Sequence, residues 1–171
     1  GAAEALRRGA LVHRLLAGLA ALDGAARAGA GLRLLGIEAA DWPEAARQGL
    51  LAEVLAVLEL EALAPLFAPG SLAEVPLAGT LDGVAVTGRI DRLAVFDDLV
   101  LIADFKTDAR PPAAGAVPAA HRDQIALYAG LVARLFPGTA VEGRLVYTAG
   151  PIVHALGAEE LGDRLARLTS P

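Results

Sequence analysis

Two acidic residues and the only lysine of the chain lie close together in the sequence and could form a metal site. Asp91 stands in the segment Gly-Arg-Ile-Asp-Arg, and the segment Asp104-Phe-Lys106 begins thirteen residues after it. Carboxylate pairs are typical of sites for Mg²⁺ or Mn²⁺, because these cations prefer oxygen ligands. A lysine beside them supplies a compact positive charge that can orient a water molecule. This combination indicates a divalent-cation site with a lysine that can act on a water molecule beside the ion.

The spacing of these residues predicts that they meet on a β-hairpin. Apolar runs precede and follow Asp97-Asp98, which is a two-residue polar break of the kind that closes a hairpin. Counting back from this loop along both strands places Asp91 opposite Asp104, with Cβ atoms roughly 5 Å apart. Lys106 follows two positions after Asp104, so we expect it to point to the same face.

A third acid, Glu74, is predicted to lie beside Asp91 on the preceding strand. Asp82-Gly83 stands between apolar residues and is typical of a two-residue hairpin loop. Counting back from this loop places Glu74 opposite Asp91, so that Glu74, Asp91 and Asp104 form a row across three strands. Adjacent like charges repel, and a divalent cation among them would remove the repulsion. The alternative interpretation is a polar sheet face in contact with solvent.

The composition is compatible with one domain and excludes several kinds of site. The 171 residues can form a sizeable core, and no long uncharged apolar run predicts a membrane span. The chain contains no cysteine, which excludes disulfides and an iron–sulfur cluster. The net charge of −5 is unfavourable for binding nucleic acid without assistance. We expect residues 1–171 to form one domain excised from a larger protein, because no initiating methionine or signal sequence is present.

The periodicity of the chain predicts helices, then a three-stranded antiparallel meander, then helix, strand and helix, which makes a mixed α/β sheet flanked by helices. Residues 24–36 are expected as a Gly/Ala-rich loop or short helix, Asp41 as a helix N-cap, and Pro76 on an edge strand. The other expected elements are helices over 4–22, 43–48, 50–64, 119–136 and 158–168, strands over 71–80, 84–96, 99–107, 141–148 and 152–156, and a loop over 107–120.

The spacing of the three histidines does not by itself identify any of them as a metal ligand. His13 lies within the first predicted helix, where a lone histidine is usually structural or solvated. His121 and His154 have no second ligand at helical or strand spacing, so we expect both to be solvated.

A larger set of chemical groups occurs in a characteristic order along the chain. Gln124 and Tyr128 are four residues apart on a predicted helix and share a face. The full order is His13, Glu74, Gly-Arg-Ile-Asp ending at Asp91, Asp104-Phe105-Lys106, and Gln124 with Tyr128. This order resembles the RecB-type branch of the PD-(D/E)XK nucleases, and its closest likeness is to the C-terminal nuclease domain of AddA-type helicase–nucleases. The resemblance implies a restriction-endonuclease-like fold.

The resemblance also implies a role for each matching residue. His13, Asp91, Asp104 and the backbone carbonyl of Phe105 would bind Mg²⁺, for which Mn²⁺ could substitute. Asp91, Asp104 and Lys106 would form the catalytic set, with Lys106 positioning the attacking water.

Further residues would complete this site beside the DNA. Gln124 and Tyr128 would line the site next to the DNA strand. Glu74 would support a ligand of the metal or bind a second metal ion, or it would be a polar strand residue without a role in the site. Arg89 and Arg92 flank Asp91 and could contact phosphate or neutralise acids, and Arg110 and Arg122 are further candidate DNA contacts.

By the same resemblance, the chain would be a deoxyribonuclease that acts in double-strand-break repair in the bacterial cytoplasm. It would work with an upstream helicase region of the same chain and with an AddB-like partner subunit. The chain itself lacks the Gly-x-x-x-x-Gly-Lys-Ser/Thr phosphate loop of a helicase motor. The alternative hypothesis is a catalytically inert module of the same fold that docks a partner or guides DNA.

Overall fold

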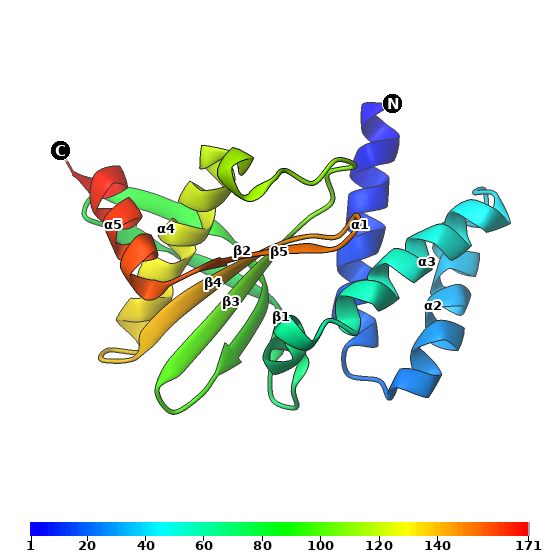
Figure 1. Cartoon of the computed structure of the whole chain (residues 1–171), viewed down its shortest axis with the longest axis horizontal. Coiled ribbons are helices and arrows are strands. Elements are labelled where there is room, and N and C mark those ends of the chain that lie inside the picture. The colour runs from blue at the N-terminus through cyan, green and yellow to red at the C-terminus, as the bar shows by residue number, and fades with distance from the viewer. Residues whose placement is uncertain (171) are drawn as a thin grey trace.

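The computed structural model describes residues 1–170; Pro171, the last residue of the expected domain, lies outside the described residues. Helices pack on both sides of a single sheet (Figure 1). The elements are α1 (Ala2–Leu19), α2 (Gly24–Glu38), α3 (Glu44–Leu58), the 3₁₀ helix η1 (Glu61–Phe67), β1 (Leu72–Leu81), β2 (Val84–Val95), β3 (Leu99–Lys106), the 3₁₀ turn η2 (Ala114–Ala116), α4 (Ala119–Leu135), β4 (Ala140–Tyr147), β5 (Ile152–Leu156) and α5 (Ala158–Thr169).

The five strands follow one another in sequence order across the sheet. β1, β2 and β3 form the predicted antiparallel meander, and Pro76 lies on the edge strand β1. β4 pairs parallel to β3, because α4 carries the chain back across the sheet before β4 begins. β5 returns antiparallel to β4 and forms the other edge. The predicted mixed α/β sheet flanked by helices is therefore confirmed.

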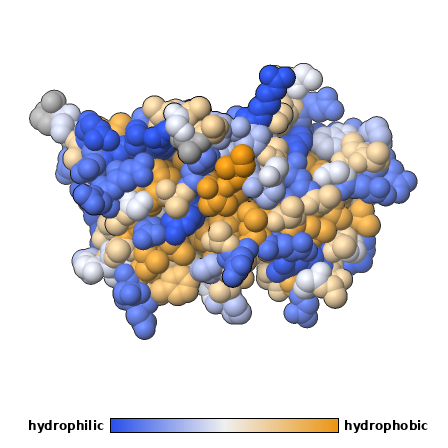
Figure 2. Space-filling view, viewed as in Figure 1, coloured by the Kyte–Doolittle hydropathy of each residue, from blue (hydrophilic) through white to orange (hydrophobic). Residues whose placement is uncertain are grey.

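Two separate apolar clusters cover the two faces of this sheet. One cluster joins α1, α2 and α3 to Ala103 and Phe105 of β3. The other joins α4 and α5 to Val100 and Ile102 of the same strand. Adjacent residues of a strand point to opposite faces, so β3 is apolar on both sides, as its sequence predicts. Figure 2 shows hydrophilic residues over much of one surface of the molecule, with apolar residues gathered near its centre.

The helical region before the sheet differs from the prediction in how it is divided into helices. Residues 24–36 belong to a full helix, α2, in which Gly31 lies against the side chain of Leu51 on α3. A Cβ at Gly31 would overlap that leucine, so a small residue allows the two helices to approach closely. The two helices expected over 43–48 and 50–64 are instead the single helix α3 followed by η1.

The expected helix cap at Asp41 is also wrong. Pro43 occupies the N-cap position of α3, and no side chain caps the helix. Asp41 accepts two hydrogen bonds from the guanidinium of Arg7 on α1, at 2.6 and 2.7 Å. This contact holds the pKa of Asp41 at about 2, because the carboxylate is hydrogen-bonded to a cation. None of the described helices has both the length and the apolar character needed to cross a membrane.

Candidate active site

The two predicted hairpin registers are confirmed over the residues that pair, and the acids lie on three neighbouring strands. Val75 pairs with Ile90 and Ala73 with Arg92, so Glu74 and Asp91 stand opposite each other between β1 and β2. On the other side, the pairing of β2 with β3 ends at Arg92 and Ala103, so Asp91 and Asp104 are the first residues beyond the paired segment.

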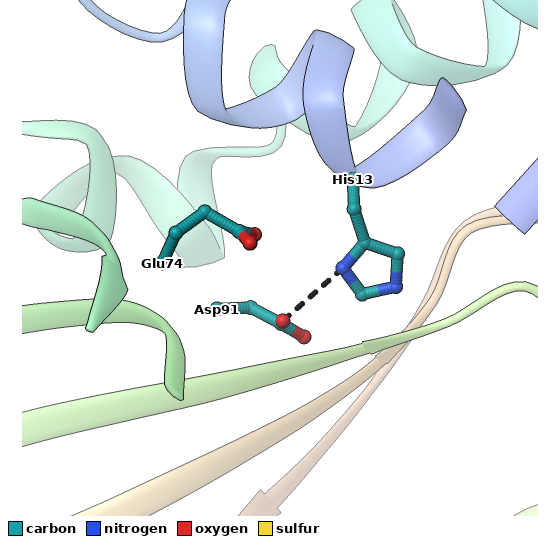
Figure 3. A group of neighbouring side chains, drawn as sticks. All are labelled: His13, Glu74 and Asp91. Atoms are coloured by element: carbon teal, nitrogen blue, oxygen red, sulfur yellow. Dashed lines mark hydrogen bonds and ion pairs between the residues drawn. The ribbon is translucent and has the colours of Figure 1, made fainter. Parts of the chain in front are cut away.

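His13, Glu74 and Asp91 form a group whose ligand atoms all lie within 4.8 Å of one another (Figure 3). His13 projects from α1 toward the sheet, and its Nδ1 lies 3.1 Å from Oδ1 of Asp91. Helix α1 presents His13 here because its apolar face, which includes Val12 and Leu16, packs against the sheet. This group can hold a metal ion, and it joins a histidine and two acids from three elements.

The backbone is distorted where Glu74 enters the group. Glu74 has a φ of 54°, in the left-handed region that residues with a side chain seldom adopt. Such strain costs of order 1–3 kcal/mol and often occurs at functional sites. The carboxylate of Glu74 is paired with Nε of Arg89 at 2.7 Å. Arg89 therefore neutralises an acid in this structure, which is one of its two expected roles.

Asp91 also contacts the backbone of β3. Its Oδ2 accepts a hydrogen bond of 2.6 Å from the Phe105 amide, while its Oδ1 faces His13. Asp91 is only 6% exposed. These contacts fix the carboxylate at the place where the backbone pairing of β2 and β3 ends. The structure thus shows the Phe105 N–H bound to Asp91, and metal binding by the Phe105 carbonyl stays a prediction.

Asp104 and Lys106 begin a second chain of contacts that leads to α4. Nζ of Lys106 lies 2.7 Å from Oδ2 of Asp104 and donates a hydrogen bond of 2.7 Å to Oε1 of Gln124. Nε2 of Gln124 in turn donates to the Tyr128 hydroxyl at 3.1 Å. Asp104 lies outside the group of His13, Glu74 and Asp91, so the predicted row of three acids is divided between two sets of contacts.

Electrostatic effects connect the two sets. The pKa of Asp104 is raised mainly by burial and further by the negative charge of Asp91, while Lys106 opposes the shift. The pKa of His13 is raised mainly by its hydrogen bond to Asp91, and Glu74 and Asp104 act in the same direction. A divalent cation would stabilise the ionised form of these buried, mutually repelling acids. The donor set therefore fits a metal ion with oxygen and imidazole ligands.

Tyr128 reaches this site only because residue 88 is a glycine. A Cβ on Gly88 of β2 would overlap the hydroxyl group and ring of Tyr128, which is 6% exposed. We predict that Gly88→Ala lowers the free energy of unfolding by about 1–3 kcal/mol, because the core must shift to admit a methyl group. Urea denaturation measures this change.

Gly49→Ala is the matched control for the Gly88 variant. Gly49 lies within α3 with no atom near its Cβ position, so alanine there should stabilise the helix by about 0.5–1 kcal/mol. A Gly88→Ala protein as stable as the wild type would show that Tyr128 is not held as the structure has it.

A polar network holds the end of β3 and was not predicted. The amide of Thr148 donates to the Lys106 carbonyl at 2.9 Å, and its hydroxyl donates to Oε1 of Glu53 at 2.6 Å. Arg8 of α1 pairs with the other oxygen of Glu53. The network joins α1, α3 and the end of β4 to the backbone of Lys106. The sequence carries no signal for it, because its members are far apart along the chain.

Three residues near the site do not lie where they were expected. Arg92 is buried; its Nε donates to the Leu66 carbonyl at 2.9 Å, and its guanidinium lies over the Phe67 ring. Its guanidinium therefore has a structural role; it is too buried to contact phosphate as one expectation had it, and it does not pair with the acids of the site. The expectation that His121 and His154 are solvated is also wrong, because both are partly buried and pack against Tyr147.

Of the two remaining arginine candidates, one lies in the segment between β3 and α4 and the other lies on α4. Arg110 is exposed on the segment that follows β3. Arg122 is partly buried on α4 and donates to the Val117 carbonyl at 3.2 Å. Their contact with DNA stays a prediction.

The chain matches the family model of the PD-(D/E)XK nuclease superfamily over residues 1–161, and it belongs to that superfamily. Its mixed sheet with flanking helices agrees with the restriction-endonuclease-like fold of such proteins. Membership points to nuclease activity, and these nucleases generally use divalent metal ions.

Comparison with individual proteins adds little to the family assignment. No curated protein matches the chain. One solved structure, described as the crystal structure of SSO0001, is 15% identical with a TM-score of 0.37. The match covers 73% of this chain and 65% of that chain.

Proposed function

We propose that the chain is a metal-dependent deoxyribonuclease domain that hydrolyses phosphodiester bonds. The observation that carries this proposal is the meeting of two sets of groups at the place where the pairing of β2 and β3 ends. One set, His13, Glu74 and Asp91, has the geometry of a cation site, and the adjacent Asp104–Lys106 pair adds a buried acid and an ammonium group. A metal ion and an ammonium group together can stabilise the negative charge that develops on a phosphate during hydrolysis.

His13, Asp91 and Asp104 would hold Mg²⁺ or Mn²⁺ together with the Phe105 carbonyl, and Glu74 would be an additional or outer ligand. The bound cation would polarise the scissile phosphate and lower the pKa of a water molecule. Lys106 would stabilise the negative charge that develops on the phosphate oxygens. The hydrogen bond from Lys106 to Gln124 limits the positions of the ammonium group, so its charge is oriented before the substrate arrives.

The biological setting that we propose is double-strand-break repair by a bacterial helicase–nuclease. The order of His13, Gly-Arg-Ile-Asp91, Asp104-Phe105-Lys106 and Gln124-x-x-x-Tyr128, which resembles the RecB and AddA type, supports this proposal. The net charge of −5 also supports it, because a domain with this charge benefits from a motor and an AddB-like subunit that deliver the DNA. In this setting the domain is one part of a larger cytoplasmic protein.

The function is tested by cleavage of labelled linear DNA with Mg²⁺ or Mn²⁺. Asp104→Ala is expected to lower the rate by roughly 100-fold or more, because it removes a buried acid beside Lys106. Asp82→Asn, in the exposed turn between β1 and β2, is the matched control and should cleave like the wild type. Cleavage by the Asp104 variant at the wild-type rate would exclude this site, and an inactive wild type would favour an inert docking module.

A further inference from the structure

A second pair of polar side chains lies beside Lys106 and has no part in the site described above. Tyr147, the last residue of β4, is the pairing partner of Lys106 in the parallel ladder. Partners in a parallel ladder point to the same face, and here that face carries α4. The Tyr147 hydroxyl lies 2.7 Å from Nδ1 of His121, which is one turn before Gln124 on α4. Lys106 and Tyr147 thus each contact α4, at Gln124 and His121.

The burial of Tyr147 determines which member of the Tyr147–His121 pair donates the hydrogen bond. Tyr147 has no exposed surface, and burial raises the pKa of its phenol, so the hydroxyl keeps its proton. Among residues 1–170 the hydroxyl has only Nδ1 of His121 as a hydrogen-bond partner. The phenol therefore donates its proton to Nδ1, because a buried O–H without an acceptor is costly.

The imidazole of His121 is consequently held in one tautomer. Its pKa is lowered, first by burial and then by the positive charge of Lys106, which favours the neutral ring. The nearby acids Asp108 and Asp104 oppose this shift, but within the described chain neither makes a hydrogen bond with the ring. A neutral ring that accepts at Nδ1 carries its hydrogen on Nε2. No described residue accepts a hydrogen bond from Nε2.

We propose that His121 contacts the DNA at this site, with its Nε2–H donating a hydrogen bond to a phosphate oxygen of the strand bound beside Lys106. Tyr147 is then a positioning residue that orients the ring and selects its tautomer. The proposal rests on the proposed nuclease function and adds a substrate contact from the first turn of α4. A neutral donor next to a lysine supplies a directional hydrogen bond where Lys106 supplies charge.

Three substitutions separate a DNA contact from a structural role. The amide of His121→Asn can replace Nδ1 opposite Tyr147 but has no group at the position of Nε2. The longer His121→Gln places an amide N–H near the position of Nε2, and His121→Ala has neither group. If His121 contacts DNA, the Asn and Ala variants should raise KM for a single-stranded oligonucleotide about tenfold or more, and Gln should stay within about threefold of the wild type.

The same variants are compared in two further measurements, thermal unfolding and binding of a fluorescent oligonucleotide in EDTA. The Asn variant should melt within about 2 °C of the wild type and should bind about tenfold more weakly. Equal KM and binding for the wild type, Asn and Gln proteins would overturn the proposal, as would equal losses in the Asn and Gln variants.

The binding measurement also separates this proposal from the proposed function. A wild type that binds DNA through His121 but does not cut it would support the contact and reject the nuclease activity. A wild type that cuts DNA with no dependence on His121 would support the nuclease activity and reject the contact. A wild type that neither binds nor cuts would overturn both.

Discussion

Lys106→Ala is expected to lower the rate of DNA cleavage by roughly 100–1000-fold, which is the usual effect of removing one preorganised group that stabilises a developing charge. Lys106 is the only lysine of the chain, and it is mostly buried between Asp104 and Gln124. Another cation cannot easily move into this position. The loss should appear in kcat, with a smaller change in KM, because the charge acts mainly on the transition state.

Lys106→Arg tests whether charge alone is sufficient. The guanidinium is larger and planar, and the space between Asp104 and Gln124 is matched to an ammonium group, so we expect only partial recovery of kcat. Arg134→Ala removes a cation from α4 at an exposed position and is the control for net charge. A Lys106→Ala protein with the wild-type kcat would show that the ammonium group takes no part in the reaction.

Mn²⁺ is expected to stabilise the wild-type protein strongly and the Asp91→Asn variant very little. At a metal concentration of about 100 times Kd, binding to the folded state contributes about 2.7 kcal/mol. For a domain of this size that corresponds to a rise in Tm of about 5–10 °C. Asp91 is central to the effect, because it contacts His13 and lies within ligand distance of Glu74. Its conversion to an amide removes the charge that the cation would neutralise.

The matched control for this experiment is Asp41→Asn. Asp41 is also an acid paired with a basic residue, Arg7, but it lies in the turn before α3 rather than in the metal-binding group. This variant should lose some stability and keep the full Mn²⁺-dependent rise in Tm. An equal rise in the Asp91 and Asp41 variants would mean that the cation binds elsewhere. No rise in the wild type would favour the inert module.

The sequence by itself determined the hairpins and therefore the order of the acids. Two-residue loops and alternating side chains are local properties, and they specify a register without information from distant parts of the chain. The registers through Asp97-Asp98 and Asp82-Gly83 were predictable for this reason, as was the edge position of Pro76. The motif order was sufficient to indicate the superfamily that the family model then matched.

Only the tertiary structure decided which of these groups meet. The register predicts that Glu74, Asp91 and Asp104 are neighbours, but the grouping depends on where α1 places His13 and on the positive φ of Glu74. The contact of Lys106 with Gln124 and that of Tyr147 with His121 depend on the approach of α4 to the sheet.

Helix packing explains the remaining differences. The Gly/Ala-rich segment became a complete helix because Gly31 allows α2 to approach α3, and Asp41 binds Arg7 of α1 instead of capping its own helix. Local helix propensity changes the free energy of folding by a few tenths of a kcal/mol per residue. Packing an apolar helix face against its neighbours contributes several kcal/mol. Periodicity therefore sufficed for the strands, while the helices and the side chains that they bring to the site depended on contacts between distant segments.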